Sequence, residues 1–306
     1  MTNHFKDFLK ENETKPNDID KQSFSTSLEK DKGKTIKESS VGFLGPKGTF
    51  SHQATLNFSK KSKLIAFSSI KEIFEAVNNE DVDLGLVPAE NSIGGIVSDT
   101  INKLIEYSLK TTGSFDFPIH HFLLGKTKNI KKLKVIKSHP QALSQCKDWI
   151  EKNLPRVKLE SSSSTTSPII ANKSKKSIGF IGSSRAAKEY DLNILAERIE
   201  STQHNLTKFY VISKNINKKV CKKLKAQKSL VLLAVYDRVG ILRDILDVFA
   251  SEELNLTSLH SVPSRLKPWD YFFFLEVQTP LSSSALSKTL EKIKDYCSTI
   301  RVIGAS

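Results

Sequence analysis

The chain has 306 residues, a length that predicts two domains rather than one compact core. Its hydrophobic fraction of 38% suits a soluble globular protein, and no apolar run could span a bilayer, so we expect no membrane partner. The formal charge of +14 comes from scattered lysines without a recognition motif, which argues against nucleic acid. Three widely spaced cysteines suit a reducing cytoplasm and argue against disulfides or a zinc site.

The N-terminal segment, residues 1–40, is rich in Lys, Asp, Glu, Ser and Asn. It lacks the continuous apolar stretch of a secretory signal, and its acidic residues argue against a transit peptide. So little apolar material cannot support a packed core. We therefore expect a disordered tail that is dispensable for stability and activity.

Short apolar runs alternate with helical patterns between residue 41 and about residue 213. The expected strands are 41–44, 63–67, 84–87, 118–124, 135–137, 177–181 and 209–212. The expected helices are 51–59, 69–78, 99–109, 141–153 and 183–190. Such alternation is typical of an α/β domain with a mainly parallel sheet covered on both faces.

The remainder of the chain divides into a linker and a second domain. Residues 214–228 contain seven lysines among scattered apolar residues, which indicates a solvated linker. Residues 229–306 then follow the order βαββαβ, which predicts a ferredoxin-like fold. The expected strands are 229–236, 255–263, 271–278 and 299–303, and the expected helices are 240–251 and 283–296.

Polar loops follow two apolar runs of the α/β domain, where α/β folds build their sites. The segments are Gly45-Pro46-Lys47-Gly48-Thr49-Phe50-Ser51 and Pro88-Ala89-Glu90-Asn91-Ser92-Ile93-Gly94-Gly95. Together with Ser138-His139-Pro140-Gln141-Ala142-Leu143-Ser144-Gln145 and Asn205-Leu206-Thr207-Lys208-Phe209, they closely resemble the prephenate dehydratase family. The resemblance runs from about residue 41 to the C-terminus. It implies a two-lobed catalytic domain, built like a periplasmic binding protein, that makes phenylpyruvate for phenylalanine biosynthesis.

The implied reaction removes a carboxylate and a hydroxyl from prephenate and leaves an aromatic ring. It therefore runs downhill, and a proton donor with two anion clamps suffices, without a metal or an organic cofactor. Arogenate differs from prephenate by an amine in place of a keto group, and the sequence leaves this choice open. A non-catalytic sensor on the same fold is a further alternative. The tail is too short and too polar for a chorismate-mutase-like segment, so we expect a monofunctional chain.

Thr207 is the expected catalytic residue, because the family places its essential hydroxyl in a Thr-Arg-Phe motif that reads Thr207-Lys208-Phe209 here. A threonine hydroxyl can donate a hydrogen bond to a leaving oxygen without carrying charge. Local sequence alone favours a simpler interpretation, in which Thr207 is a good β-former. Lys208 keeps the charge of the family's Arg but loses the planar fork that Arg offers a carboxylate.

The resemblance also implies Asn91 and Gln145 as catalytic residues. Asn91 lies in a segment that could equally form a capped turn into the next helix. A carboxylate at Glu90 would repel a dianionic substrate, which suggests a structural role for this residue. Hydroxyls and N–H groups at the beginning of a helix suit an anion at residues 48–51, with helix capping as the alternative. The expected substrate-binding residues are Thr49, Phe50, Ser51, Glu90, Ser92, Ser138, Thr165, Lys208 and Phe209.

The C-terminal domain resembles the ACT domain, a small-molecule sensor, in Asp237-Arg238-Val239-Gly240-Ile241-Leu242 and Asn255-Leu256-Thr257. The segment 263–271 resembles one found in dehydratases and aromatic amino-acid hydroxylases. The resemblance implies L-phenylalanine as an allosteric inhibitor, bound at a seam between ACT domains of a homodimer or homotetramer. The family's Glu-Ser-Arg-Pro reads His260-Ser261-Val262-Pro263 here, so we expect weak inhibition. The expected effector-binding residues are Gly240, Leu242, Ser261 and Pro263.

Overall fold

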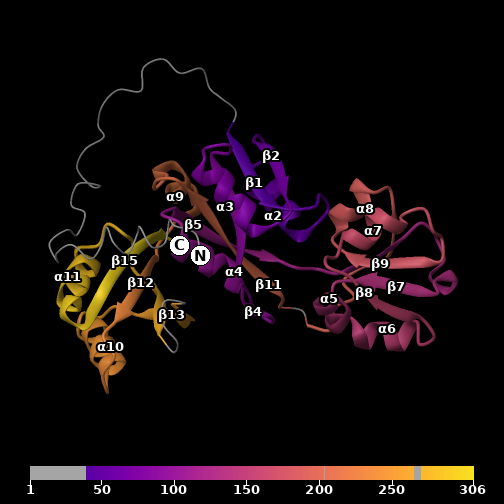
Figure 1. The fold of residues 1–306 in the computed structure, drawn as a ribbon. Helices are drawn as coiled ribbons and strands as arrows, with labels where there is room; N and C mark the ends of the chain where they lie inside the picture. The colour runs from indigo at the N-terminus through magenta and orange to yellow at the C-terminus, as the bar shows by residue number, and fades with distance from the viewer. Residues whose placement is uncertain (1–38, 203, 265–269) are drawn as a thin grey trace, which may run out of the picture.

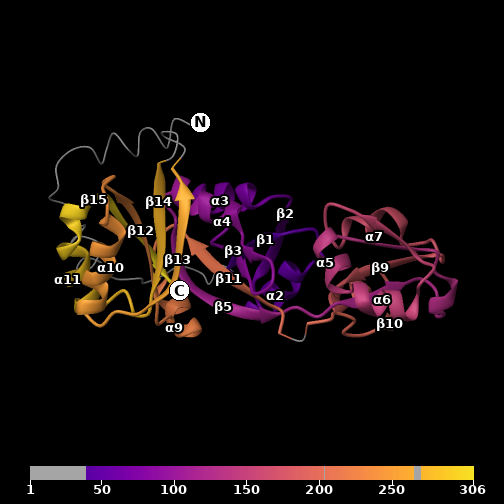
Figure 2. The ribbon, with the colours of Figure 1, turned by 90° about the horizontal axis from the view of Figure 1, so that it is seen from below.

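The computed structural model describes residues 39–202, 204–264 and 270–306. The expected tail lies almost wholly outside the described residues, as does most of the segment 263–271. Figures 1 and 2 show three units in a row, with the C-terminal unit at one end, a first lobe in the middle and a second lobe at the other end. None of the helices in the described ranges is long and apolar enough to cross a membrane.

The first lobe is built from chain on both sides of the second lobe. Strands β2, β1 and β3 pair in parallel, and β11 runs antiparallel between β3 and β5. The direction changes because the chain leaves this lobe after β5 and returns to it as β11. The elements are β1 (Ser40–Leu44), α2 (Phe50–Phe58), β2 (Lys63–Phe67), α3 (Ile70–Asn78), β3 (Leu84–Asn91), β4 (Gly95–Ile96), α4 (Ser98–Glu106), β5 (Lys110–Pro118) and β11 (Leu206–Ser213).

The second lobe repeats this plan with a five-stranded sheet in the order β10-β6-β9-β7-β8. Strands β8, β7 and β9 pair in parallel, and β6 runs antiparallel to its two neighbours, β9 and β10. Both lobes therefore have mixed sheets with a parallel half. The elements are β6 (Phe122–Gly125), η2 (Ile130–Lys132), β7 (Val135–Ser138), α5 (Pro140–Gln145), α6 (Lys147–Asn153), β8 (Lys158–Ser161), α7 (Ser167–Asn172), β9 (Ile178–Gly182), α8 (Ser184–Glu189) and β10 (Asn193–Ala196).

Several expected boundaries in these lobes are wrong. The expected strand 118–124 is two strands, because the chain crosses between the lobes at residues 119–121. The polar run 110–114 was not expected to be a strand, yet β5 forms because β11 and β15 pair on its two sides. The expected helix 141–153 is interrupted at Cys146, which separates α5 from α6. Strands β8 and β10 were also not expected.

The lysine-rich segment 214–228 is more ordered than a solvated linker. It contains α9 (Lys218–Leu224), whose N-cap Asn217 accepts a hydrogen bond from Val220 N–H. Val220 is buried in the core of the first lobe. A Cβ added at Gly113 of β5 would lie 2.7 Å from the side chain of Leu224, so the helix lies directly on that strand. Two apolar residues thus bury one face while the lysines remain on the other.

The C-terminal unit has the expected order βαββαβ. Its helices α10 and α11 cover one face of the sheet, where Ile245, Phe249 and Leu286 form a core with strand residues. The other face looks toward the first lobe. The elements are β12 (Ser229–Val235), α10 (Ile241–Ser251), β13 (Leu256–Pro263), β14 (Tyr271–Val277), α11 (Ser284–Lys292), η3 (Lys294–Tyr296) and β15 (Cys297–Ala305).

The C-terminal unit and the first lobe share one ten-stranded sheet, in the order β13-β14-β12-β15-β5-β11-β3-β1-β2 with β4 beside β3. The junction is the parallel pairing of Gly304 with Thr111 and of Ala305 with Thr112. Glycine is required there, because a Cβ at position 304 would lie 2.1 Å from the carbonyl oxygen of Thr111. The strands at this seam can therefore approach only because one of them lacks a side chain.

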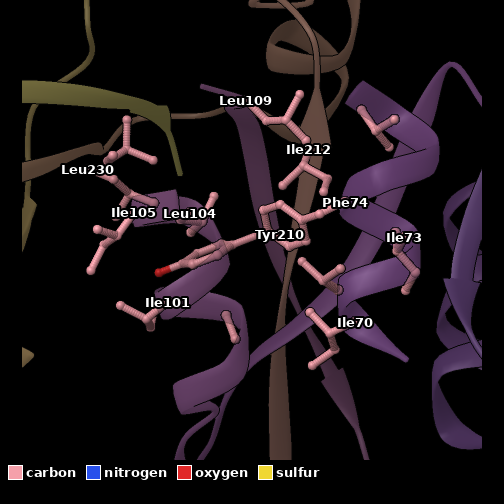
Figure 3. Close-up of a cluster of buried hydrophobic side chains, with 14 of the residues drawn as sticks. Ile70, Ile73, Phe74, Ile101, Leu104, Ile105, Leu109, Tyr210, Ile212 and Leu230 are labelled. Atoms are coloured by element: carbon pink, nitrogen blue, oxygen red, sulfur yellow. The ribbon is translucent and has the colours of Figure 1, made fainter. Parts of the chain in front are cut away.

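The first lobe and the C-terminal unit share one hydrophobic core where they meet. Figure 3 shows Tyr210 of β11 among residues of α3 and α4, with Leu230 of β12 approaching from the C-terminal unit. Phe272 and Phe274 of β14 belong to the same buried cluster. The guanidinium of Arg301 in β15 also donates to the carbonyl oxygens of Leu104 and Ile105 at the end of α4. The C-terminal unit is therefore packed onto the first lobe and not merely tethered to it.

Candidate active site

Thr207 and Asn91 are brought together by strand pairing. They are direct partners in the register of β11 against β3, at the end of each strand that faces the second lobe. Directly opposed residues on neighbouring strands point to the same face of a sheet, so their side chains meet. Asn91 Nδ2 lies 3.0 Å from Thr207 Oγ1. Thr207 is only 9% exposed.

The side chain of Asn91 is oriented by backbone donors. Its Oδ1 accepts hydrogen bonds from Ile93 N–H at 3.1 Å and from Gly94 N–H at 2.8 Å, and from Gln141 Nε2 at 3.3 Å. The amide nitrogen must therefore face Thr207 and donate to its hydroxyl oxygen. Because that oxygen accepts, the hydroxyl proton of Thr207 is left to be donated elsewhere.

The chain of amides continues across the lobe boundary. Asn91 Nδ2 donates to Asn205 Oδ1 at 2.7 Å, and Asn205 Nδ2 donates to Gln145 Oε1 at 3.0 Å. Each amide is thus fixed by the one before it, starting from the backbone donors on Asn91. The Nε2 of Gln145 is buried and has no hydrogen-bond partner among the described residues. The three predicted catalytic residues therefore lie in one hydrogen-bonded group.

His121 completes the group, which we call the amide cluster: Asn91, His121, Gln145, Asn205 and Thr207. Its Nε2 lies 2.7 Å from Gln145 Oε1, and since an amide oxygen can only accept, His121 Nε2 carries a proton. Burial lowers the pKa of His121 below its usual value, which favours the neutral ring. Its buried Nδ1 is then an acceptor, and it has no partner within the described ranges.

The first turn of α2 reaches the amide cluster through an aromatic contact. The ring of Phe50 meets that of His121 edge to face, with centroids 5.3 Å apart. Thr49 is the N-cap of the helix, accepting a hydrogen bond from His52 N–H at 3.2 Å. Ser51 is buried in the same turn. Capping thus occupies the hydroxyl of Thr49, and Phe50 is the member of this set that contacts the cluster.

Ser92 supports the segment that returns from the second lobe. Its hydroxyl donates to the carbonyl oxygen of His204 at 3.0 Å and accepts from Leu206 N–H at 2.9 Å. The backbone N–H of Ser92 also donates to Leu206 O at 2.9 Å. Both roles of the hydroxyl are therefore used to hold the chain just before Thr207, and its substrate-binding role stays a prediction.

Two predicted residues of the second lobe are not brought into the amide cluster by any hydrogen bond described for the chain. Ser138 is fully buried, and its hydroxyl donates to Ile181 O at 2.7 Å, which joins β7 to β9. Thr165 is half-buried in the loop before α7. Its neighbour Thr166 is fully buried, and the hydroxyl of Thr166 lacks a partner among the described residues.

The other two residues of the Thr-Lys-Phe motif also lie away from the amide cluster. Lys208 points to the opposite face of β11, where its Nζ lies 3.3 Å from Glu276 Oε2 and 3.8 Å from Glu90 Oε2. Phe209 is 1% exposed and stacks on Phe115 in the first lobe. Glu90 therefore has Lys208 as a charged neighbour, and both its structural role and its substrate-binding role stay predictions. A carboxylate clamp at Lys208 stays a prediction that this arrangement does not favour.

The predicted effector residues lie at one end of the C-terminal sheet. Gly240 is the N-cap of α10 in a left-handed conformation, and Leu242 is half-buried in that helix. Ser261 and Pro263 are exposed near the end of β13. Strands β12 and β13 both run antiparallel to β14, so the loops that follow them lie at the same end. Effector binding there stays a prediction.

Asn205 and His121 were not predicted as site residues. Asn205 lies in the segment that carried the resemblance, and an amide two residues before the expected catalytic hydroxyl was an available signal, because alternate residues of an extended chain share a face. His121 gave no such signal. It contacts Gln145 only because the crossing segment at residues 119–121 passes α5, and local sequence does not encode that contact.

Comparisons with known proteins identify the family of this chain. A model of the prephenate dehydratase family matches residues 41–217, more than half of the chain. This chain belongs to the prephenate dehydratase family. A model of the ACT domain matches residues 229–295, so the C-terminal ferredoxin-like unit is an ACT domain.

Relatives in the prephenate dehydratase family cover both domains. The prephenate dehydratase of Methanocaldococcus jannaschii is 36% identical over 85% of this chain and 94% of its own length. The bifunctional chorismate mutase/prephenate dehydratase of Aquifex aeolicus is 35% identical over 88% of this chain and 74% of its own. A solved prephenate dehydratase from Arthrobacter aurescens in complex with L-Phe has a TM-score of 0.77 at 25% identity, covering 87% of this chain and 89% of that one.

Proposed function

We propose that this prephenate dehydratase converts prephenate to phenylpyruvate with Thr207 as the proton donor. The observation that carries the assignment is the hydrogen bond from Asn91 Nδ2 to Thr207 Oγ1 at 3.0 Å. A hydroxyl oxygen that already accepts from a fixed amide directs its own proton away from that amide, toward a bound substrate. A threonine side chain does this without adding negative charge to a site for a dianion.

The proposed step is balanced by one proton. The bond between the ring carbon and its carboxylate breaks, and the electron pair enters the ring as carbon dioxide leaves. The carbon–oxygen bond to the hydroxyl breaks at the other end of the ring, and the hydroxyl leaves as water after receiving a proton. Thr207 donates the hydrogen bond through which this proton arrives, and solvent restores it. No change of oxidation state of an external group is required.

Neutral donors bind the substrate in this proposal. Gln145 Nε2 has two hydrogens and no partner among the described residues, so it can donate to a carboxylate without a competing bond being broken. Its orientation is fixed by Asn205 and His121, which both donate to Gln145 Oε1. A donor that is already aimed loses little freedom when the substrate arrives.

The test is incubation of the purified protein with prephenate while phenylpyruvate is followed by absorbance. We expect steady formation of phenylpyruvate by the parent and almost none by the Thr207→Ala variant. A parallel assay with arogenate compares the two substrates. Turnover of arogenate without turnover of prephenate would show that arogenate is the substrate. Turnover of neither would overturn the enzymatic proposal in favour of a sensor.

Regulation and assembly are part of the same proposal. L-phenylalanine binds at a seam between two ACT domains of a dimer, and inhibition is weak. The relative from Arthrobacter aurescens was solved with L-Phe, and β13 forms an edge of the sheet with Leu259 exposed. Val262, which stands where the family has Arg, is buried in the core shared with the first lobe. An ionic ligand contact at that position is therefore replaced by packing.

Assembly and effector binding can be measured on the full chain. Light scattering should give at least twice the mass of one chain, and calorimetric titration should show weak binding of L-phenylalanine. His260→Glu restores the acidic residue of the family motif at a half-buried position, and we expect it to tighten binding. A monomer with unchanged affinity in the variant would rule out the seam.

A further inference from the structure

A buried carboxylate lies where the ACT domain meets the first lobe. Glu276 of β14 is 1% exposed, and on the face that it shares with Phe272 and Phe274 it looks toward the first lobe. Burying an ionised carboxylate is costly unless charged and hydrogen-bonding groups surround it. The contacts of this carboxylate therefore determine whether it can remain charged.

Both oxygens of the Glu276 carboxylate have donors. Oε1 accepts from Lys228 Nζ at 2.7 Å and from Thr257 Oγ1 at 2.6 Å, and Oε2 accepts from Ser306 Oγ at 2.9 Å. Lys208 Nζ lies 3.4 Å and 3.3 Å from the two oxygens. We call this set of five residues the Glu276 cluster: Lys208, Lys228, Thr257, Glu276 and Ser306. Burial opposes the charge, but these contacts hold the pKa of Glu276 at about 2.

The cluster reaches the strand that carries the proposed proton donor. Lys208 follows Thr207 directly on β11, and neighbouring residues of a strand point to opposite faces. The ammonium of Lys208 is thus held behind the strand while the hydroxyl of Thr207 is presented in front of it. The same cluster also contacts β5, because Ser306 Oγ lies 2.8 Å from Ser114 Oγ.

We propose that Glu276 is a positioning residue for the dehydration reaction: by holding Lys208 behind β11, it fixes the strand from which Thr207 donates its proton. The inference rests on the proposed function. It makes the ACT domain a support for the catalytic strand in addition to its sensing role. It also gives Lys208 a function that requires a charge but no planar fork, which explains why this chain tolerates Lys at that position.

If the pair of Lys208 and Glu276 served stability alone, its loss would leave kcat unchanged in every molecule that still folds. If Glu276 positions Thr207, the loss of Glu276 moves Thr207 relative to the substrate. Displacements of about 1 Å can cost roughly 100-fold in rate. Loss of the positioning contact should therefore lower kcat with little change in KM, since Gln145 and the rest of the substrate contacts lie on the other face of β11. The split between kcat and KM separates the two roles.

The test compares Glu276→Gln with a matched control, Glu252→Gln. Glu252 also binds two lysines, Lys288 and Lys292, but all three lie within the ACT domain. We expect Glu276→Gln to lower kcat about tenfold with KM within a factor of two, while Glu252→Gln retains parental values. In the double variant Lys208→Met with Glu276→Gln, kcat should fall no further than in the single variants, because the two residues act as a unit.

Folding is checked in parallel, because Glu276→Gln leaves Lys228 without this counter-charge and leaves Lys208 with Glu90, 3.8 Å away. Rates are compared only between variants that melt in one cooperative transition, and the double variant also removes the charge of Lys208. A kcat for folded Glu276→Gln equal to that of Glu252→Gln would overturn the inference. So would multiplicative losses of kcat in the double variant.

Hydrogen exchange provides a readout that is independent of turnover. We expect faster exchange of the amides of residues 206–210 in Glu276→Gln and unchanged exchange there in Glu252→Gln. If the parent protein fails to turn over prephenate, the proposed function fails, and this measurement still decides whether Glu276 positions β11. Identical exchange of residues 206–210 in the parent and in Glu276→Gln would overturn the inference.

Discussion

The amide cluster and the Glu276 cluster lie on opposite faces of β11, and they differ in how completely their groups are paired. The amide cluster is neutral, and within the described ranges Gln145 Nε2 and His121 Nδ1 have no hydrogen-bond partner. In the Glu276 cluster, charged groups meet and both carboxylate oxygens accept hydrogen bonds. Buried groups left without partners indicate a place for a ligand, whereas fully paired groups rigidify a structure. One strand can therefore present a reactive hydroxyl because its other face is fixed.

The largest effect is expected when the amide cluster loses the hydroxyl of Thr207. Thr207→Ala should lower kcat by about 10²–10⁴-fold, the usual range for removal of a general acid. The melting temperature should stay close to that of the parent. Thr207→Ser is the matched control, because it keeps the hydroxyl, and it should retain most of the activity. Near-parental turnover by Thr207→Ala at saturating prephenate would contradict the assignment.

Removal of the unpaired donor should act mainly on substrate affinity. Gln145→Met keeps the length of the side chain but loses the amide, and we expect the KM for prephenate to rise about 10–100-fold, the value of a hydrogen bond to a charged group. Gln278→Met serves as a control, because Gln278 is exposed in the ACT domain and hydrogen-bonds to Asn255. Equal KM values for the two variants would remove Gln145 from the substrate site.

The seam that joins the two units can be broken at a residue that belongs to neither cluster. Gly304→Ala would place a Cβ 2.1 Å from Thr111 O, so β15 or β5 must shift. We expect a loss of roughly 1–3 kcal/mol in the free energy of unfolding, as is usual for overpacked sites. Gly182→Ala is the control, since its added Cβ would lie no closer than 3.7 Å to a neighbour. Denaturant unfolding of both variants checks the difference.

Acid should weaken the fully paired cluster. The pKa of Glu276 is lowered from its ordinary value of 4.5 to about 2 in the folded chain. The stability that this shift contributes is fully present above pH 4.5 and is lost as the pH falls toward 2. The melting temperature of the parent should therefore decline more steeply in this window than that of Glu276→Gln. Parallel curves for the two proteins would show that Glu276 is not held in its charged form.

The smallest effect is expected for Lys208→Arg, which keeps the positive charge behind β11. Both kcat and KM should stay within about twofold of the parent, because the proposed positioning role requires a positive charge at this residue but no planar fork. Lys208→Ala is the informative companion. A rise in KM would support the carboxylate clamp suggested by the motif, and a fall in kcat at constant KM would support the positioning role.

Sequence patterns predicted the elements whose own apolar residues recur at the spacing of a strand or a helix. The runs at 41–44 and 63–67 are strands, and the βαββαβ order of the C-terminal unit is confirmed. Strand β5 could not be predicted, because its polar first half is a strand only between β11 and β15. Helix α9 escaped notice because only Val220 and Leu224 anchor it among lysines.

The candidate site was predictable where its residues lie in the family's motifs, and not where the crossing of the chain between the lobes brings residues together. Thr207 and Asn91 were identified from their motifs, and strand register places them together. His121 meets Gln145 only through the crossing of the chain. The separation of Lys208 from Thr207 was available from sequence, since neighbours on a strand face opposite ways, but the family motif suggested that both face the substrate.

The shared ten-stranded sheet has a consequence for how the protein is made. The second lobe comes from one continuous stretch of chain, so it can fold while the ribosome is still adding later residues. The first lobe needs β11 from beyond that stretch, and β5 is covered only when β15, the last nine residues before Ser306, has been synthesised. A chain released before Cys297 leaves the edges of β5 and β12 unpaired, and exposed strand edges invite aggregation. Synthesis of β15 therefore completes the shared sheet.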